Sequence, residues 1–265
     1  MRLTPYALLA AATLLAGCAT RNAANSTPPP QPAPAPVKAQ EATPQQRAQI
    51  RVDLAAGYYE RGQMSVALDE LAEAARLDPN NARVYNVYGL VYTVMGEKAK
   101  AEESFRKAVA MAPNDSDIRH NWGAFLCTTG REREGIPEFD KAISNPLYRT
   151  PEIALINAGK CSAQIREYAQ ADRYFRQALT VSPDNPVAAY NLALLAFRES
   201  RLDDARAWMR PVMQQAAPPP EALYLGMCIE RKHGDRQAEL SYTSQLRNRY
   251  PDSAEAKALP GGACE

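Results

Sequence analysis

The sequence predicts an all-α solenoid built from repeated helical hairpins. Pro79 and Pro113 lie 34 residues apart, and small residues and a tyrosine stand at matching offsets before each of them. A single hairpin of this length cannot bury its apolar face alone, so neighbouring hairpins must stack. Such a stack presents an extended surface, which favours binding over catalysis.

The sequence aligns as six repeats whose first residues lie near 48, 82, 116, 152, 186 and 219. Small residues fall at the eighth position: Ala55, Gly89, Gly123, Gly159, Ala193 and Gly226. They also fall at the twentieth: Ala67, Ala101, Gly135, Ala171, Ala205 and Ala238. Helices whose axes lie about 8–10 Å apart need small side chains where they cross. Larger residues at position 24 are expected to fill the seam to the next repeat: Leu71, Phe105, Phe139, Phe175, Met209 and Tyr242.

The period and these residue types resemble the tetratricopeptide repeat. Six near-register copies occupy residues 45–252, about four fifths of the chain. The resemblance implies a right-handed superhelical solenoid of six helix-turn-helix repeats, followed by a tail at 253–265. Residues 144–151 lengthen one spacing to 36 residues, and residues 216–220 are rich in proline, so wider turns are expected there. Pro211 lies inside a second helix and should kink or shorten it.

Residues 1–17 have the form of a signal peptide, with one charge at Arg2 before an apolar run too short to span a bilayer. The run ends in Leu15-Ala16-Gly17-Cys18, which resembles the lipobox of bacterial lipoproteins. The resemblance implies lipid attachment at Cys18. Because Ala19 and not aspartate follows, it also implies the outer membrane, facing the periplasm. An ordinary secretory peptide with an incidental cysteine is the alternative.

Residues 18–44 are rich in proline, alanine, asparagine and serine, and they alternate proline with other residues between 28 and 36. This composition cannot form a core. Proline favours the polyproline II conformation, which rises about 3.1 Å per residue. We therefore expect a semi-rigid tether between the lipid and the repeats.

Four cysteines remain beside Cys18, and an exported chain meets an oxidising compartment. Cys127 and Cys161 lie in the first helices of adjacent repeats, which stack side by side, so we expect a disulfide between them. Cys228 and Cys264 would then tie the tail to the last repeat. Buried free thiols are the alternative.

Charge and motif content exclude several classes of function. The chain has 31 basic and 30 acidic residues with no basic face, which argues against nucleic acid as a partner. We find no metal-ligand cluster, phosphate loop or nucleophile motif, and so predict no metal, no cofactor, no small-molecule substrate and no enzymatic activity. His120 is interpreted as a contact in the groove and not as a catalytic base.

In tetratricopeptide arrays the first helices line the concave surface, and positions 2, 5, 9 and 12 point into it. Two apolar stretches of candidate groove residues result. The first is Val52, Ala56, Tyr59, Asn86, Leu90 and Thr93. The second is Ile153, Ile156, Lys160, Tyr190, Leu194 and Phe197. An apolar stripe of this kind suits an amphipathic helix or an extended peptide. We expect about half of these side chains to pack between repeats instead.

Two segments resemble the type IV pilus biogenesis and stability lipoproteins, the PilF/PilW family. They are Asn121-Trp122-Gly123-Ala124-Phe125-Leu126-Cys127, and Asn145-Pro146-Leu147-Tyr148 with the following Asn157-Ala158-Gly159-Lys160-Cys161. The resemblance implies an outer-membrane pilotin that binds secretin subunits of the type IV pilus and promotes their localisation and multimerisation. Two other roles stay open from the repeats alone: a scaffold for peptidoglycan-remodelling enzymes, and a subunit of an outer-membrane protein assembly machine.

Overall fold

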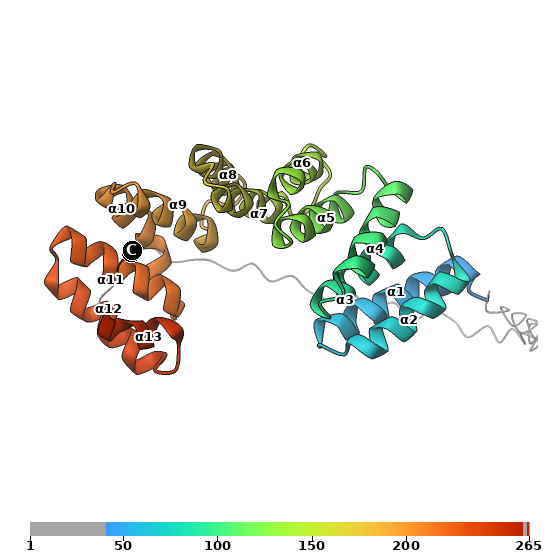
Figure 1. Cartoon of the computed structure of the whole chain (residues 1–265), viewed down its shortest axis with the longest axis horizontal. Coiled ribbons are helices and arrows are strands. Elements are labelled where there is room, and N and C mark those ends of the chain that lie inside the picture. The colour runs from blue at the N-terminus through green and yellow to red at the C-terminus, as the bar shows by residue number, and fades with distance from the viewer. Residues whose placement is uncertain (1–40, 262–263, 265) are drawn as a thin grey trace, which may run out of the picture. The chain divides into compact units, whose positions relative to one another are not determined.

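The structure, a computed structural model, describes residues 41–261 and residue 264. Over this part the chain is all helical, and twelve α-helices form six consecutive hairpins, which confirms the predicted solenoid (Figure 1). The first helices are α1 (Pro44–Glu60), α3 (Ala82–Val94), α5 (Ser116–Thr128), α7 (Pro151–Gln164), α9 (Pro186–Arg198) and α11 (Pro220–His233). The second helices are α2 (Met64–Leu77), α4 (Lys98–Met111), α6 (Glu132–Ile143), α8 (Tyr168–Val181), α10 (Leu202–Met213) and α12 (Arg236–Arg249).

Each first helix packs against the second helix of its own hairpin and against the first helix of the next hairpin. The buried apolar residues follow this pattern, because every core cluster draws on two or more neighbouring repeats. The core is therefore continuous along the stack and has no single centre.

The turn inside each hairpin contains one residue in the left-handed conformation. Four of the six are glycines: Gly62, Gly96, Gly130 and, in the last hairpin, Gly234. In the fourth and fifth hairpins Arg166 and Ser200 take this conformation, with φ of 64° and 59°. Residues with a Cβ adopt it at a cost, so tertiary packing fixes these two turns.

The first helices begin at recognisable capping residues. Asn81, Asp115 and Asn185 each accept a hydrogen bond from a backbone N–H in the first turn of the helix that follows. Proline occupies the first position of α1, α7, α9 and α11, where its missing N–H removes no helical hydrogen bond.

Two second helices contain an internal proline and are shorter than the others. Pro137 lies inside α6 and Pro211 inside α10, and both helices have 12 residues. The second helices without an internal proline, α2, α4, α8 and α12, have 14 residues each. The expected shortening at Pro211 is thus present.

The residues at positions 8 and 24 match each other in size. A Cβ built on Gly89 would lie 2.6 Å from the ring of Phe105, and one on Gly159 would lie 2.5 Å from the ring of Phe175. Glycine is therefore required where phenylalanine crosses the hairpin. The first repeat has alanine at position 8 and the smaller Leu71 at position 24.

The tail extends the solenoid instead of leaving it. Residues expected to lie outside the repeats form α13 (Ala254–Ala258) and a 3-10 helix (Leu259–Gly261), and α13 contacts α11 and α12. The side chain of Ser253 caps α13, and Leu259 is buried against the last hairpin. Cys264 is joined by a disulfide to Cys228 in α11, with Cα atoms 5.4 Å apart.

Candidate functional site

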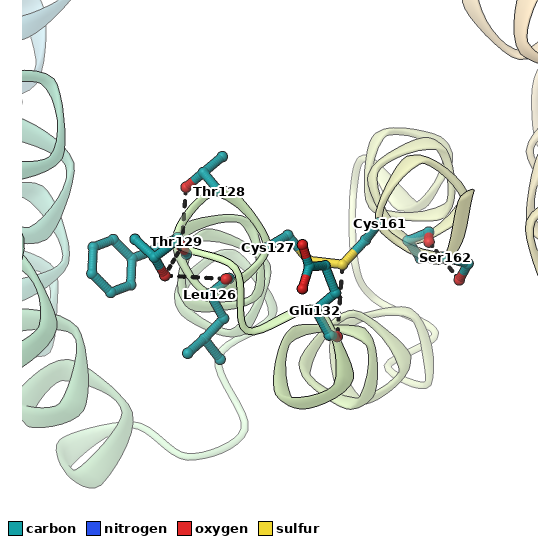
Figure 2. The surroundings of a disulfide bond; sticks show 9 residues. Leu126, Cys127, Thr128, Thr129, Glu132, Cys161 and Ser162 are labelled. Carbon is teal, nitrogen blue, oxygen red and sulfur yellow. Dashed lines mark hydrogen bonds between the residues drawn. A yellow bond between two sulfur atoms is a disulfide. The ribbon is translucent and has the colours of Figure 1, made fainter. Parts of the chain in front are cut away.

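A disulfide joins the first helices of the third and fourth hairpins, across the junction with the longer spacing. Cys127 of α5 and Cys161 of α7 have Cα atoms 5.8 Å apart, and Figure 2 shows the bond between the two helices, close to the start of α6. Gly135 completes this arrangement, because a Cβ at that position would lie 2.7 Å from both the sulfur of Cys127 and the backbone oxygen of Gly123. The third repeat therefore has glycine at position 20, where the other five repeats have alanine.

His120 of α5 also links the third and fourth hairpins, through hydrogen bonds. Its Nδ1 lies 3.0 Å from the hydroxyl of Tyr148, in the loop before α7, and its Nε2 lies 3.1 Å from Nδ2 of Asn157 in α7. An amide nitrogen donates, so Nε2 accepts and the neutral ring carries its proton on Nδ1. Burial lowers the pKa of His120, which favours this neutral form. The interpretation of His120 as a groove contact stays a prediction, and the structure shows that both ring nitrogens are engaged within the protein.

Several predicted groove residues are buried, and most of these stand at position 5 of their repeat. Val52 has no exposed surface, and Asn86 and Ile156 are less than a tenth exposed. The reason is that position 5 of one first helix meets position 6 of the next. Asn121 donates a hydrogen bond to Asn86 in this way, as Asn157 does to His120. These side chains hold neighbouring repeats together and are not free to contact a partner.

The remaining predicted residues divide between the two ends of the array. Ala56, Tyr59 and Leu90 are half-buried in the first two hairpins. Ile153 is exposed at the start of α7, with 45% of its surface accessible. Position 2 thus remains exposed at Ile153, whereas position 12 is buried at Phe197, which is only 4% exposed.

A defined groove lies at the C-terminal end of the array, and we call it the C-terminal groove. It has a volume of about 350 Å³ and is bounded by α9, α11 and α13. The predicted Tyr190, Leu194 and Phe197 all line it. The other lining residues are Glu221, Tyr224, Leu225, Cys228, Ala254, Glu255 and Ala258. The structure thus brings together three predicted residues with a wall from the tail, which sequence reasoning placed elsewhere.

The groove has an apolar floor with carboxylates beside it. Burial in the first place, and then the negative charges of Glu221 and Glu255, raise the pKa of Tyr190. A neighbouring hollow of about 300 Å³ shares Tyr190 and Glu221 with the C-terminal groove and extends toward Lys160 and Val187. Together the two hollows form an apolar surface along the first helices of the fourth to sixth hairpins.

A second candidate surface lies on the first hairpin, and sequence reasoning missed it. A hollow of about 570 Å³ is lined by Ile50, Leu54 and Leu77 with Arg47, Arg51, Glu73 and Arg76. Ile50 stands at position 3 and is 56% exposed, whereas the equivalent Val84, Ile118 and Ala154 are buried. Within the described residues no hairpin precedes α1, so this face lacks the neighbour that the later repeats have. The signal in the sequence was an apolar residue at position 3 of a terminal repeat.

Three further points concern the anchor, metal sites and membrane-spanning helices. Cys18 and the tether up to residue 40 lie outside the described residues. In the described part, no cluster of histidine, cysteine and acidic side chains has the arrangement of a metal site. None of the helices between residues 41 and 261 combines the length and hydrophobicity needed to cross a bilayer.

Known proteins resemble this chain over most of the solenoid. A family model of the tetratricopeptide repeat matches residues 52–116 and 163–218. The type IV pilus assembly protein PilF of Pseudomonas aeruginosa is 29% identical over 204 residues, which cover 77% of this chain and 81% of PilF. The crystal structure of PilW, a widely conserved type IV pilus biogenesis factor, is 31% identical with a TM-score of 0.74, covering 81% of this chain and 99% of that one. The chain belongs to the PilF/PilW family.

The solved structure of Pseudomonas aeruginosa PilF agrees with this assignment. It is 27% identical, has a TM-score of 0.75, and matches 83% of this chain and 99% of its own length. Membership of the family indicates a role in type IV pilus biogenesis. The tetratricopeptide fold of these pilus factors is a scaffold fold and suggests a non-enzymatic role.

Proposed function

We propose that this protein is an outer-membrane lipoprotein pilotin, which binds secretin subunits of the type IV pilus and promotes their outer-membrane localisation and multimerisation. The observation that carries the proposal is the likeness to PilW and PilF over nearly the full length of both structures. The lipobox-like sequence before Cys18 supports membrane attachment. The grooves on the first and last hairpins support capture of a protein segment.

In this proposal the lipid anchor fixes the location of the protein, and the solenoid binds the partner. Acyl chains on Cys18 would hold the protein at the periplasmic face of the outer membrane, and two or more chains give stable attachment. The solenoid would bind one segment of each secretin subunit. Tethering both partners to one membrane raises their effective concentration, so subunits would meet and multimerise more readily.

Deletion of the gene followed by unheated gel analysis of the secretin tests the proposal. We expect secretin multimers to be reduced in the outer membrane, with monomers remaining in other fractions, and plasmid-borne wild-type protein to restore them. Normal multimers in the deletion strain would refute the pilotin function. A defect in cell-wall remodelling with normal multimers would indicate the scaffold role instead.

A further inference from the structure

The C-terminal groove carries negative charge that the protein itself does not neutralise. Glu221 and Glu255 both line the groove and both act on the pKa of Tyr190, and neither makes an ion pair among the described residues. Elsewhere in the last hairpin the acidic side chains are paired: Glu230 with Arg206, and Glu239 with Arg231. The two groove carboxylates therefore stand apart from the ion-pair pattern around them.

Local structure explains how these charges are tolerated without a cation. Glu221 lies in the first turn of α11 and Glu255 in the first turn of α13. Glu221 is exposed and Glu255 is partly exposed, so water solvates both charges. Two elements from different parts of the chain thus each place a carboxylate at one apolar groove.

A basic side chain lies near the groove, toward the C-terminal end of α11. Lys232 lies in the last turn of α11, and its Nζ is 4.4 Å from the centre of the Phe197 ring. Glu221 and Lys232 are separated by most of the length of α11, which is roughly 16 Å at 1.5 Å per residue. The C-terminal groove is therefore lined by apolar side chains and by two carboxylates, and Lys232 lies beside it against Phe197.

We propose that the C-terminal groove binds a short apolar protein segment that carries a lysine or arginine at one end, placed between Glu221 and Glu255. The apolar side chains of this segment lie against the partly exposed Tyr190 and Leu194. The volume of about 350 Å³ is at the lower end of that of ligand pockets, so the groove accepts a few side chains and not a folded domain. An acidic residue near the other end of the segment would face Lys232.

The wall formed by α13 is part of this site. Ala254, Glu255 and Ala258 come from the tail, and the disulfide between Cys228 and Cys264 fixes the tail against α11. Rigid walls lower the entropy that binding would otherwise cost. The disulfide therefore prepares the groove for its segment. The inference rests on the proposed function in one respect, since it takes the secretin as the source of the segment.

Binding of overlapping synthetic peptides from the secretin of the same organism to the full-length mature protein in detergent tests the inference. Fluorescence anisotropy should identify binding peptides that are apolar and contain a lysine or arginine. Leu194→Glu should weaken the best peptide by about tenfold or more, which corresponds to 1.4 kcal/mol or more. Leu240→Glu, at an exposed position of α12 that lines neither surface, is the matched control and should leave the affinity unchanged. Leu54→Glu tests the hollow on the first hairpin separately.

Exchanging the charges of the protein and the peptide distinguishes a loss of recognition from a loss of folding. The double variant Glu221→Lys/Glu255→Lys should weaken the same peptide about tenfold, because two attractive contacts become repulsive. Replacing the basic residue of the peptide with glutamate should restore binding to the double variant and weaken binding to the wild type. Loss of helical circular dichroism would mark a variant as misfolded, and the charge-exchange pair then decides the question.

The outcomes distinguish this inference from the pilotin function. If Leu54→Glu removes binding while Leu194→Glu keeps it, the segment binds the first hairpin, and the inference is wrong although the pilotin function stands. If no secretin peptide binds the wild type, the inference is also wrong. Should the protein dimerise in light scattering, and Leu194→Glu make it monomeric, the groove holds a second copy instead. The gene deletion alone decides the pilotin function.

Discussion

At the scale of single residues, packing explains departures from the repeat pattern. Gly135 stands where the other repeats have alanine, because the sulfur of Cys127 and the backbone oxygen of Gly123 occupy the space that a Cβ would need. Gly89 and Gly159 make room for the phenylalanine that crosses each hairpin. The glycines are visible in the sequence, but only the contacts explain why a larger side chain is excluded at these positions.

His120 is the residue whose role changed most between sequence and structure. Its position within the repeat predicted a groove contact, but its neighbours outside the repeat pattern engage both ring nitrogens. Tyr148 comes from the longer loop and Asn157 from the following helix. The edge of the ring also packs against Phe139, with centroids 5.6 Å apart. His120 therefore holds the irregular junction together.

We predict that His120 makes the stability of the solenoid depend on pH. Burial lowers the pKa of His120 below its usual value of 6.5, so the unfolded chain binds more protons than the folded chain as the pH falls. The contribution is fully present above about pH 6.5 and is lost as the pH falls through the folded-state pKa. Urea unfolding above about pH 5, where most carboxylates stay charged, should show this loss. A His120→Gln variant that kept the full pH dependence would contradict the prediction.

At the scale of elements, two disulfides reinforce places where the repeat is irregular. One spans the junction after the third hairpin and closes a separation of 34 residues. The other joins α11 to the tail, with a separation of 36 residues. The first link does not replace packing, because α6 also packs closely against α7 at the same junction. The second link fixes the short α13 and the tail to the last hairpin.

We predict that Cys161→Ser lowers the free energy of unfolding by about 3–4 kcal/mol, because a link of this span restricts the unfolded chain by that amount in the chain-entropy model. Urea unfolding monitored by circular dichroism measures the difference. Cys264→Ser serves as the comparison, because it removes a link of similar span at the end of the chain. If Cys127 and Cys161 were recovered as free thiols from the exported protein, the prediction would fail.

At the scale of the whole molecule, the solenoid has two candidate binding surfaces and one expected anchor. The hollow on the first hairpin exists because no hairpin precedes α1 among the described residues. The C-terminal groove exists because α13 adds a wall to the last hairpin. Both surfaces arise at the ends of the stack, where the repeating contacts stop.

We predict that Cys18→Ser moves the protein out of the outer-membrane fraction. Resemblance to bacterial lipoproteins implies that the thiol of Cys18 forms a thioether with a diacylglyceryl group, and serine has no thiol. Membrane fractionation followed by immunoblotting measures the distribution. Ala19→Ser, a conservative change beside the same site, is the control and should keep the outer-membrane location. Equal fractionation of Cys18→Ser and wild type would show that attachment does not depend on this cysteine.

The sequence by itself determined the solenoid, the six hairpins and the family, because period and side-chain size repeat along the chain and local packing follows from them. It also placed Tyr190, Leu194 and Phe197 near one another. Only the tertiary structure decided which predicted groove residues are free. Stacking of the first helices buries Val52, Asn86 and Ile156, and the tail folds back to build a wall. These outcomes depend on contacts between residues far apart in the chain, which a repeat pattern does not encode.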